Sequence, residues 1–299
     1  MNLSIISSNF EQVKNLNFVF FLLISQLNAI AQLTMTKIAE LPDKMAETSG
    51  LVLYDSKYLI THNDGGNKAE LFVLSLEGQH LKTIEIEDTK NVDWEDIAQD
   101  DKGHIYIGDF GNNLNKRESC QIYILPKNLS DKDKVEPKKI SFTYNDQEDF
   151  PPKDENLNYD CEAFFWKEDS LYLFTKCRSK PFTGNTNIYV LPAEEGKQKA
   201  RKIGTINLCG LGWQFCSVTA VDYYQKSNTI ALLTYSRLYL ISGFEKNEFW
   251  KGKIKSYNLG NLKQREAICF KSKNTWYLTD EYRKGLGGGN LYELTYKNQ

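Results

Sequence analysis

The sequence Asp-Trp-Glu-Asp-Ile-Ala, from Asp93 to Ala98, indicates the fold because weaker copies of it return along the chain. Each copy opens a similar run of short apolar segments. Aligning the copies places five residues at their third position: Ser49, Glu95, Glu162, Thr219 and Glu266. These residues are 46, 67, 57 and 47 positions apart. Periods of this size with several strands per period are typical of a β-propeller.

A second register supports the first. Each copy is followed by a β-branched or aromatic run that ends in polar residues, at 58–62, 105–109, 171–176, 230–235 and 276–280. A third apolar run follows in every repeat, at 71–74, 122–125, 188–191, 238–241 and 291–294. Such runs are typical of strands, and two coincident registers are hard to obtain by chance. The sequence therefore predicts an all-β fold.

The two ends of the chain show how the sheets close. Four repeats have a fourth strand-like run, at 82–86, 139–143, 202–206 and 252–256, but the fifth repeat stops before one. The run from Met35 to Glu40 precedes the first repeat and can supply the missing strand. Sharing one blade between the ends removes open sheet edges. We therefore predict a five-bladed propeller closed by the N-terminal strand, with six blades as the alternative.

Residues 1–31 are typical of an export signal. Lys14 precedes an apolar run at 18–24, and Ala29-Ile30-Ala31 resembles a cleavage site. A membrane anchor is the alternative, although the apolar run is short for a span. We expect the mature chain, residues 32–299, to be one propeller domain, secreted or periplasmic and without a stable membrane span.

The charge balance narrows the class of partner. The chain has 37 basic and 39 acidic residues and a formal net charge of −2, so no broad basic field favours nucleic acid. We expect a monomer whose partner is a small molecule, a glycan or an exported protein.

Export to an oxidising compartment makes the six cysteines informative. Cys209 and Cys216 flank a short loop, and Cys161 and Cys177 fall in neighbouring antiparallel strands, so each pair can form a disulfide or stay reduced. Cys120 and Cys269 lie in strand patterns and are expected in the core. Their spacings match no zinc pattern.

The motifs also resemble those of a known family. The chain carries Ser49-Gly50-Leu51, His62-Asn63-Asp64-Gly65, Asp93 to Ala98, Gly108-Asp109-Phe110-Gly111-Asn112-Asn113 and Glu266-Ala267. In these it resembles a family of secreted bacterial β-propeller proteins, mostly uncharacterised. More distantly it is similar to propellers grouped with esterase-like phytase domains and lactonases, many of which hold calcium on the central axis. The resemblance implies a fold and export but no substrate.

The aligned third positions suggest a metal site. The first strand of each blade lines the channel of a propeller, so Glu95, Glu162 and Glu266 should share a ring. Carboxylates in a narrow channel repel one another unless they are protonated or neutralised by a cation. Oxygen ligands suit calcium or magnesium. Alternatively, each Glu accepts hydrogen bonds from backbone N–H groups of the next blade and locks the blades together.

The ends of the second strands suggest a ligand site on the same face. His62, Asp109, Lys176, Tyr235 and Asp280 are expected at one aligned position there. Further polar residues support them: Asp64, Asn112, Arg178, Arg237 and Glu281. Strand-end loops often bind ligands, although Asn-Asp-Gly-Gly and Gly-Asn-Asn are also ordinary turn sequences.

Two hypotheses for function arise from these sites. The first is an exported binding or scaffold protein with its ligand on the polar channel face and a possible central calcium ion, because no complete catalytic constellation is evident. The second is a calcium-dependent hydrolase of a phosphoester or lactone, with a glycoside as the lesser alternative. In that case His62, Glu95, Glu162 and Glu266 are the candidate catalytic residues, and Lys176, Arg178 and Arg237 bind an anion.

Overall fold

The computed structural model describes residues 32–297, and residues 1–31, with the predicted export signal, lie outside the described part. Residues Met35 to Thr295 form one compact unit, which contains all the sites considered. The described residues form four sheets, so the all-β prediction is confirmed. Short 3-10 helices lie in the connections, at Asp43–Met45, Leu129–Asp131, Asp154–Asn156, Gln225–Ser227 and Phe249–Lys251, with one α-helical turn, α2 (Trp213–Cys216).

Each repeat forms a run of antiparallel strands. The first repeat contains β2 (Thr48–Tyr54), β3 (Tyr58–Asn63), β4 (Glu70–Ser75) and β5 (His80–Ile86). The second contains β6 (Trp94–Gln99), β7 (Ile105–Asp109), β8 (Cys120–Leu125) and β10 (Lys138–Tyr144). The third contains β11 (Asp160–Lys167), β12 (Ser170–Lys176), β13 (Asn185–Pro192) and β14 (Gly196–Asn207).

The last two repeats complete the unit. The fourth contains β15 (Val218–Tyr224), β16 (Thr229–Thr234), β17 (Arg237–Ser242) and β18 (Lys253–Asn258). The fifth contains β19 (Arg265–Ser272), β20 (Thr275–Asp280) and β21 (Asn290–Lys297), and β1 (Gln32–Glu40) pairs with β21 in the same sheet. The predicted closure of the last repeat by the N-terminal strand is confirmed. A backbone hydrogen bond from Leu41 to Gly289 (2.7 Å) continues this contact.

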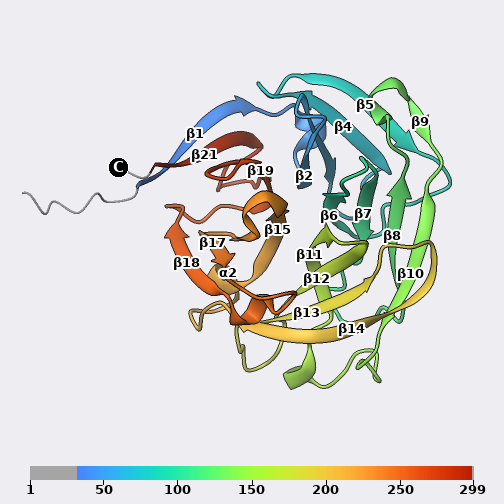
Figure 1. Cartoon of the computed structure of the whole chain (residues 1–299), viewed down its shortest axis with the longest axis vertical. Coiled ribbons are helices and arrows are strands. Elements are labelled where there is room, and N and C mark those ends of the chain that lie inside the picture. Colours follow the sequence, from blue (N-terminus) through green and yellow to red (C-terminus); the bar gives the residue numbers. More distant parts are fainter. Residues whose placement is uncertain (1–31, 298–299) are drawn as a thin grey trace, which may run out of the picture. The chain divides into compact units, whose positions relative to one another are not determined.

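The first strands of the five repeats contact one another in a closed cycle. β2 contacts β6, β6 contacts β11, and the series continues through β15 and β19 back to β2. Figure 1 shows these strands nearest the centre, with β1, β10, β14 and β18 at the periphery. Apolar residues fill the space between neighbouring sheets, as in the cluster of Trp94, Ile97, Val73 and Ile107 between the first and second repeats. Burial of these residues between sheets positions the first strands.

Buried aspartates tie neighbouring repeats together. Asp96 on β6 accepts hydrogen bonds from the backbone N–H of Ile97 (2.8 Å) and of Phe164 on β11 (3.0 Å). Asp222 on β15 likewise accepts from Tyr223 and from Phe270 on β19, both at 2.7 Å. From the sequence, this locking role was one of two alternatives for the glutamates. In the described residues the aspartates perform it, and no backbone N–H donates to Glu95, Glu162 or Glu266.

Two strand pairings were not predicted from the sequence. The outer strands β10 and β14 pair in parallel, from Ile140 with Gly196 to Tyr144 with Ala200, which joins the second and third repeats into an eight-stranded sheet. A two-residue strand, β9 (Lys134–Val135), pairs in parallel with β5. Both pairings involve the stretch between β8 and β11, which contains β9 and β10. Parallel partners far apart in sequence leave no local signal.

The cysteines form one disulfide and otherwise stay reduced among the described residues. Cys209 and Cys216 form the predicted disulfide, with Cα atoms 5.3 Å apart. The alternative pair does not form, because Cys161 lies opposite Thr175, two residues before Cys177. Cys177 instead contacts the hydroxyls of Ser179 and Thr183. Cys120 and Cys269 are buried and free, as expected.

Within residues 32–297, the structure contains no helix with the length and apolar character of a membrane span.

We predict that Asp96→Ala destabilises the protein by about 2–4 kcal/mol, because it leaves two buried N–H groups without an acceptor. Urea denaturation monitored by tryptophan fluorescence measures the change. Asp101→Ala, an exposed aspartate on the β6–β7 turn, is the control and should change the midpoint little. Equal midpoints for the two variants would show that Asp96 does not hold the repeats together.

Candidate functional site

A β-bulge near the start of every first strand defines the aligned position. The register of each first strand skips one residue: Gly50, Glu95, Glu162, Thr219 and Glu266. The sequence alignment placed Ser49 in this set, and the structure corrects it to Gly50. Ser49 instead pairs with His62, and its hydroxyl donates to the backbone oxygen of Glu95 (2.5 Å). A side chain at Gly50 would clash with the backbone of Ile97, which explains the glycine.

The second strands need a similar correction. His62, Asp109 and Asp280 lie opposite the residue before the bulge, as aligned. In the third and fourth repeats that place belongs to Thr175 and Thr234, so Lys176 and Tyr235 lie one residue further along. The shift of one residue matters because side chains alternate between the two faces of a strand. Lys176 and Tyr235 therefore point to the opposite face of their strands from the position aligned with His62.

Three carboxylates converge in one part of the molecule. One carboxylate oxygen from each of Asp64, Asp93 and Glu95 lies within 4.8 Å of the other two. We call these three residues the acidic cluster. Glu95 is only 7% exposed, and no hydrogen-bond donor in the described chain reaches its carboxylate. The amide of Gly65 donates to Asp64 (2.5 Å). The acidic cluster thus contains more negative charge than its neighbours satisfy.

Three sequence motifs build this cluster. His62 to Gly65 ends β3 and supplies Asp64, and Asp93 to Ala98 supplies Asp93 and Glu95. Gly108 to Asn113 supplies Gly111, whose absent side chain leaves room for Glu95 and Asp93, and a Cβ atom there would clash with both. Gly65 approaches Asp93 in the same way. Proximity to the carboxylates thus explains both glycines.

The neighbouring side chains hold the loops in place. Asn91 donates to the carbonyls of Asn63 (2.9 Å) and Asp64 (2.8 Å) and accepts from the amide of Trp94 (3.0 Å). Asp109 accepts from the amide of Asp93 (3.2 Å) and pairs with Arg117 (3.0 Å). These contacts fix the backbone on both sides of the acidic cluster without neutralising its carboxylates.

Burial and mutual repulsion raise the pKa values of the acidic cluster. Burial and the negative charges of Asp64 and Asp160 raise the pKa of Asp93 to about 6. Burial, followed by Glu162 and Asp64, raises the pKa of Glu95 well above its usual value. Burial also raises the pKa of Asp64, against the opposing effects of the Gly65 amide and Lys176. Each carboxylate is therefore harder to ionise unless a cation is present.

A basic group lies beside the acidic cluster. Lys176 Nζ donates to Glu162 Oε2 (2.9 Å) and to the Tyr235 hydroxyl (3.1 Å), and all three side chains are buried. Arg178 pairs with Asp160 (2.6 Å) and contacts Glu162 (3.4 Å) and Asn113. Burial disfavours the charge on Lys176, but Glu162, Tyr235 and Glu266 outweigh it and raise its pKa. Glu162 is thus paired, unlike Glu95.

A second acidic pair completes the polar region. Gln264 Nε2 donates to Glu266 Oε1 and to Glu281 Oε2, both at 3.1 Å, and Arg283 pairs with Glu281 (3.0 Å). Burial and Asp64 raise the pKa of Glu281 to about 7. Burial also raises the pKa of Glu266, and Glu162 adds to the effect. The predicted trio of Glu95, Glu162 and Glu266 therefore interacts electrostatically, but the structure brings a different trio within ligand distance.

Other candidates lie away from the acidic cluster or are already paired. His62 is fully buried edge-on against Trp94 (5.5 Å), its Nδ1 contacts the carbonyl of Asn63, and burial lowers its pKa to about 4. Asp280 is buried and accepts from Asn290 and Tyr292. Arg237 donates to Ser256 on the outer strand β18. The side-chain oxygen of Asn112 accepts a hydrogen bond from the backbone N–H of Arg117, and the backbone N–H of Asn112 donates to Asp160.

Several residues of this region were not predicted from the sequence. Asp93 was part of the quoted motif but was not chosen as a ligand, although it stands two residues before Glu95. Asp160 and Arg117 were also missed: Asp160 accepts the backbone amide of Asn112 from another repeat, and Arg117 reaches Asp109 from the loop between β7 and β8, which lies outside the motifs. Loops at the same strand ends expose Leu211 (68%), Trp213 (52%) and Tyr282 (54%). Exposed apolar side chains cannot be recognised without the structure.

The acidic cluster suits a hard divalent cation. Calcium is ligated by carboxylate, carbonyl and water oxygens, and the three carboxylates supply up to three such ligands. The chemistry of the donor set and the unpartnered, buried Glu95 both fit this group. A bound cation would offset the charge that burial and repulsion make costly.

Comparisons with known proteins give the fold and little more. No family model matches the chain, and no curated protein matches it. Among solved structures, the PQQ-bound aldose sugar dehydrogenase from Streptomyces coelicolor has a TM-score of 0.52 at 10% identity, covering 89% of this chain and 99% of that one. The Malassezia sympodialis allergen Mala s 1 has a TM-score of 0.50 at 9% identity, covering 87% and 92%. Such propeller neighbours support a β-propeller for this chain.

We predict that Glu95→Gln stabilises the metal-free protein at pH 8 by on the order of 1 kcal/mol. The raised pKa means that the folded state binds the Glu95 proton more tightly than the unfolded state, so stability falls as pH rises. Gln keeps the shape of Glu and removes the charge. The melting temperature at pH 5 and pH 8, in a chelator, measures the effect.

The exposed Glu77→Gln is the matched control and should behave like the wild type at both pH values. Added calcium at pH 8 should raise the melting temperature of the wild type and of Glu77→Gln but much less that of Glu95→Gln. Identical melting curves for all three proteins, with and without calcium, would contradict the burial of an unpaired carboxylate at Glu95.

Proposed function

We propose that this chain is an exported five-bladed β-propeller that binds calcium at the acidic cluster and, through it, an acidic glycan. One observation carries the proposal: Glu95 is buried without a hydrogen-bond partner in the described chain, next to Asp64 and Asp93. The five four-stranded runs and the closed cycle of first strands support five blades. The disulfide between Cys209 and Cys216 supports an oxidising destination, secreted or periplasmic.

The ligand class is inferred from the surroundings of the acidic cluster. A calcium ion held by protein carboxylates keeps positions for water or for a ligand oxygen, and a ligand carboxylate is a strong candidate. Arg178, whose side chain is 26% exposed, donates from Nε to Asp160 and from Nη2 to Asn113 and Glu162, so its Nη1 is the atom that can donate to the same group. Trp213 and Tyr282 are exposed on loops that belong to the same ends of the strands. Aromatic faces commonly contact the apolar faces of sugar rings.

Hydrolysis is the second candidate, and a different observation favours it. Lys176 hydrogen-bonds both Glu162 and Tyr235 in a buried array, and burial followed by Asp160 raises the pKa of Glu162 to about 8, although Lys176 opposes the shift. Groups that titrate near neutrality are suited to proton transfer. A bound calcium ion would polarise the carbonyl or phosphoryl oxygen of the substrate. The Glu162–Lys176–Tyr235 array would exchange a proton with the substrate.

We predict that calcium binds with one-to-one stoichiometry and that Asp93→Asn and Asp64→Asn each weaken binding at least tenfold, since each removes a ligand charge. Isothermal titration calorimetry on metal-free protein measures this, with the exposed Glu87→Gln as the control. Polygalacturonate is then titrated with and without calcium. Binding that requires calcium and is lost in Asp93→Asn supports the proposal.

Three outcomes separate the alternatives. Undiminished calcium affinity in both aspartate variants would place the metal elsewhere. Polygalacturonate binding that persists in a chelator would remove calcium from ligand recognition. Turnover of a phosphoester or lactone that requires calcium and disappears in Lys176→Met would favour the hydrolase over the binding protein.

A further inference from the structure

A cavity of about 580 Å³ lies at the opposite end of β6 from the acidic cluster. Its lining comes from the turns that follow β6, β11 and β13, and from β7, β8 and the start of β10. Asp100 is five positions after Glu95, which corresponds to roughly 17 Å along a strand. The two sites are therefore distinct, and a ligand of this cavity is independent of the proposed function.

The fold creates this cavity where two repeats separate. The parallel pairing of β10 with β14 begins at Ile140 and Gly196. The residues that precede this pairing, Lys138 on β10 and Ala193 to Glu195 in the turn before β14, line the cavity and are outside the backbone register that joins the two strands. Ile124, Leu125 and Pro126 contribute an apolar wall. The volume falls within the usual range for small-molecule sites.

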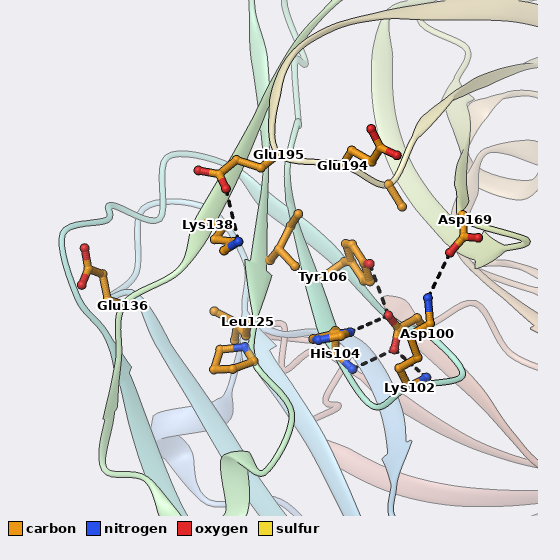
Figure 2. Close-up of a pocket in the computed structure, with 13 residues that line it drawn as sticks. Asp100, Lys102, His104, Tyr106, Leu125, Glu136, Lys138, Asp169, Glu194 and Glu195 are labelled. Carbon is orange, nitrogen blue, oxygen red and sulfur yellow. Dashed lines mark hydrogen bonds and ion pairs between the residues drawn. The ribbon is translucent and has the colours of Figure 1, made fainter.

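A buried carboxylate orients a histidine toward this cavity. The Asp100 side chain is 4% exposed, and its Oδ1 accepts from the amides of Lys102 (2.9 Å) and His104 (2.8 Å). Its Oδ2 lies 2.7 Å from His104 Nδ1 and accepts from the Tyr106 hydroxyl (3.4 Å). Figure 2 shows Asp100 between these side chains. In the neutral imidazole, a proton on Nδ1 faces the Asp100 carboxylate and leaves Nε2 as an acceptor, and no described residue hydrogen-bonds to Nε2.

The net negative charge of the residues that line the cavity favours a cationic ligand. It includes five carboxylates and two lysines, a formal charge of −3 with His104 neutral. Lys102 pairs with Asp169 (3.4 Å) and Lys138 with Glu195 (3.5 Å), which leaves Glu136 and Glu194 without an ion pair in the described chain. These carboxylates do not converge as a metal site would, since the acidic cluster is the one such group among the described residues.

We propose that this cavity binds a primary alkylammonium group. The ammonium donates to His104 Nε2 and is attracted by Glu194 and Glu136, and its alkyl chain packs on Leu125 and Pro126. A free diamine and the side chain of a lysine in a peptide share this chemistry. An acceptor nitrogen, dispersed carboxylates and an apolar wall together match such a ligand better than they match a metal ion or an anion.

Titration with cadaverine and with Nα-acetyl-lysine amide tests the proposal, with 1,5-pentanediol as the uncharged analogue. The long-range proton–nitrogen spectrum of the imidazoles is the readout, because the chain has only three histidines. We expect saturable binding of at least one amine and a shift of His104 Nε2, while His62 and His80 stay unchanged. His104→Phe and Glu194→Gln should each weaken binding at least fivefold, and the exposed Glu77→Gln should not.

Comparing the two amines also identifies the source of the ammonium group. Tighter binding of cadaverine indicates a free diamine, and tighter binding of the lysine derivative indicates a peptide. No saturable binding up to about 10 mM ligand, with no salt added beyond the buffer, overturns the proposal. Equal binding of pentanediol overturns the role of charge, and loss of binding in Asp93→Asn but not in His104→Phe places the amine at the acidic cluster instead.

Discussion

The closed cycle of first strands determines which side chains meet at the centre of the fold. Because β19 contacts β2, each of the five strands has a neighbour on both sides. The bulges place Glu95, Glu162 and Glu266 near one another at the start of these strands, where little water can solvate them. Closing the cycle therefore concentrates negative charge. The protein must then satisfy that charge with partners, with protons or with a cation.

The buried carboxylates find different kinds of partner in different parts of the protein. Lys176 and Arg178 pair with Glu162, and Gln264 bridges Glu266 and Glu281. Asp96 and Asp222 accept backbone N–H groups and so hold neighbouring repeats together. Asp64, Asp93 and Glu95 remain as the group whose charge is least satisfied. A bound cation therefore contributes most at the acidic cluster, where the chain itself supplies the fewest partners for the negative charge.

The repeats could be predicted from the sequence, because strands, their order and the closing role of β1 leave a periodic apolar pattern. Positions at the bulges could not be predicted reliably. At a bulge one residue is left out of the strand register, and contacts with neighbouring strands determine which residue this is. The aligned positions therefore shift from Ser49 to Gly50 and from Lys176 to Thr175. The acidic cluster was predicted only in part: Glu95 and Asp64 were chosen for separate roles, and Asp93 was missed although it lies in the motif. The cavity beside Asp100 depends on the parallel pairing of β10 and β14, which no local pattern indicates.

A crystal structure of the protein grown at pH 8 with calcium tests the calcium site most directly. We predict a strong peak bound by carboxylate oxygens of Asp64, Asp93 and Glu95 at roughly the 2.3–2.6 Å typical of calcium. Strontium soaked in its place should give an anomalous signal at the same point. A structure in which the three side chains turn away from one another, or Glu95 accepts backbone N–H groups and no ion is present, would contradict a calcium site at the acidic cluster.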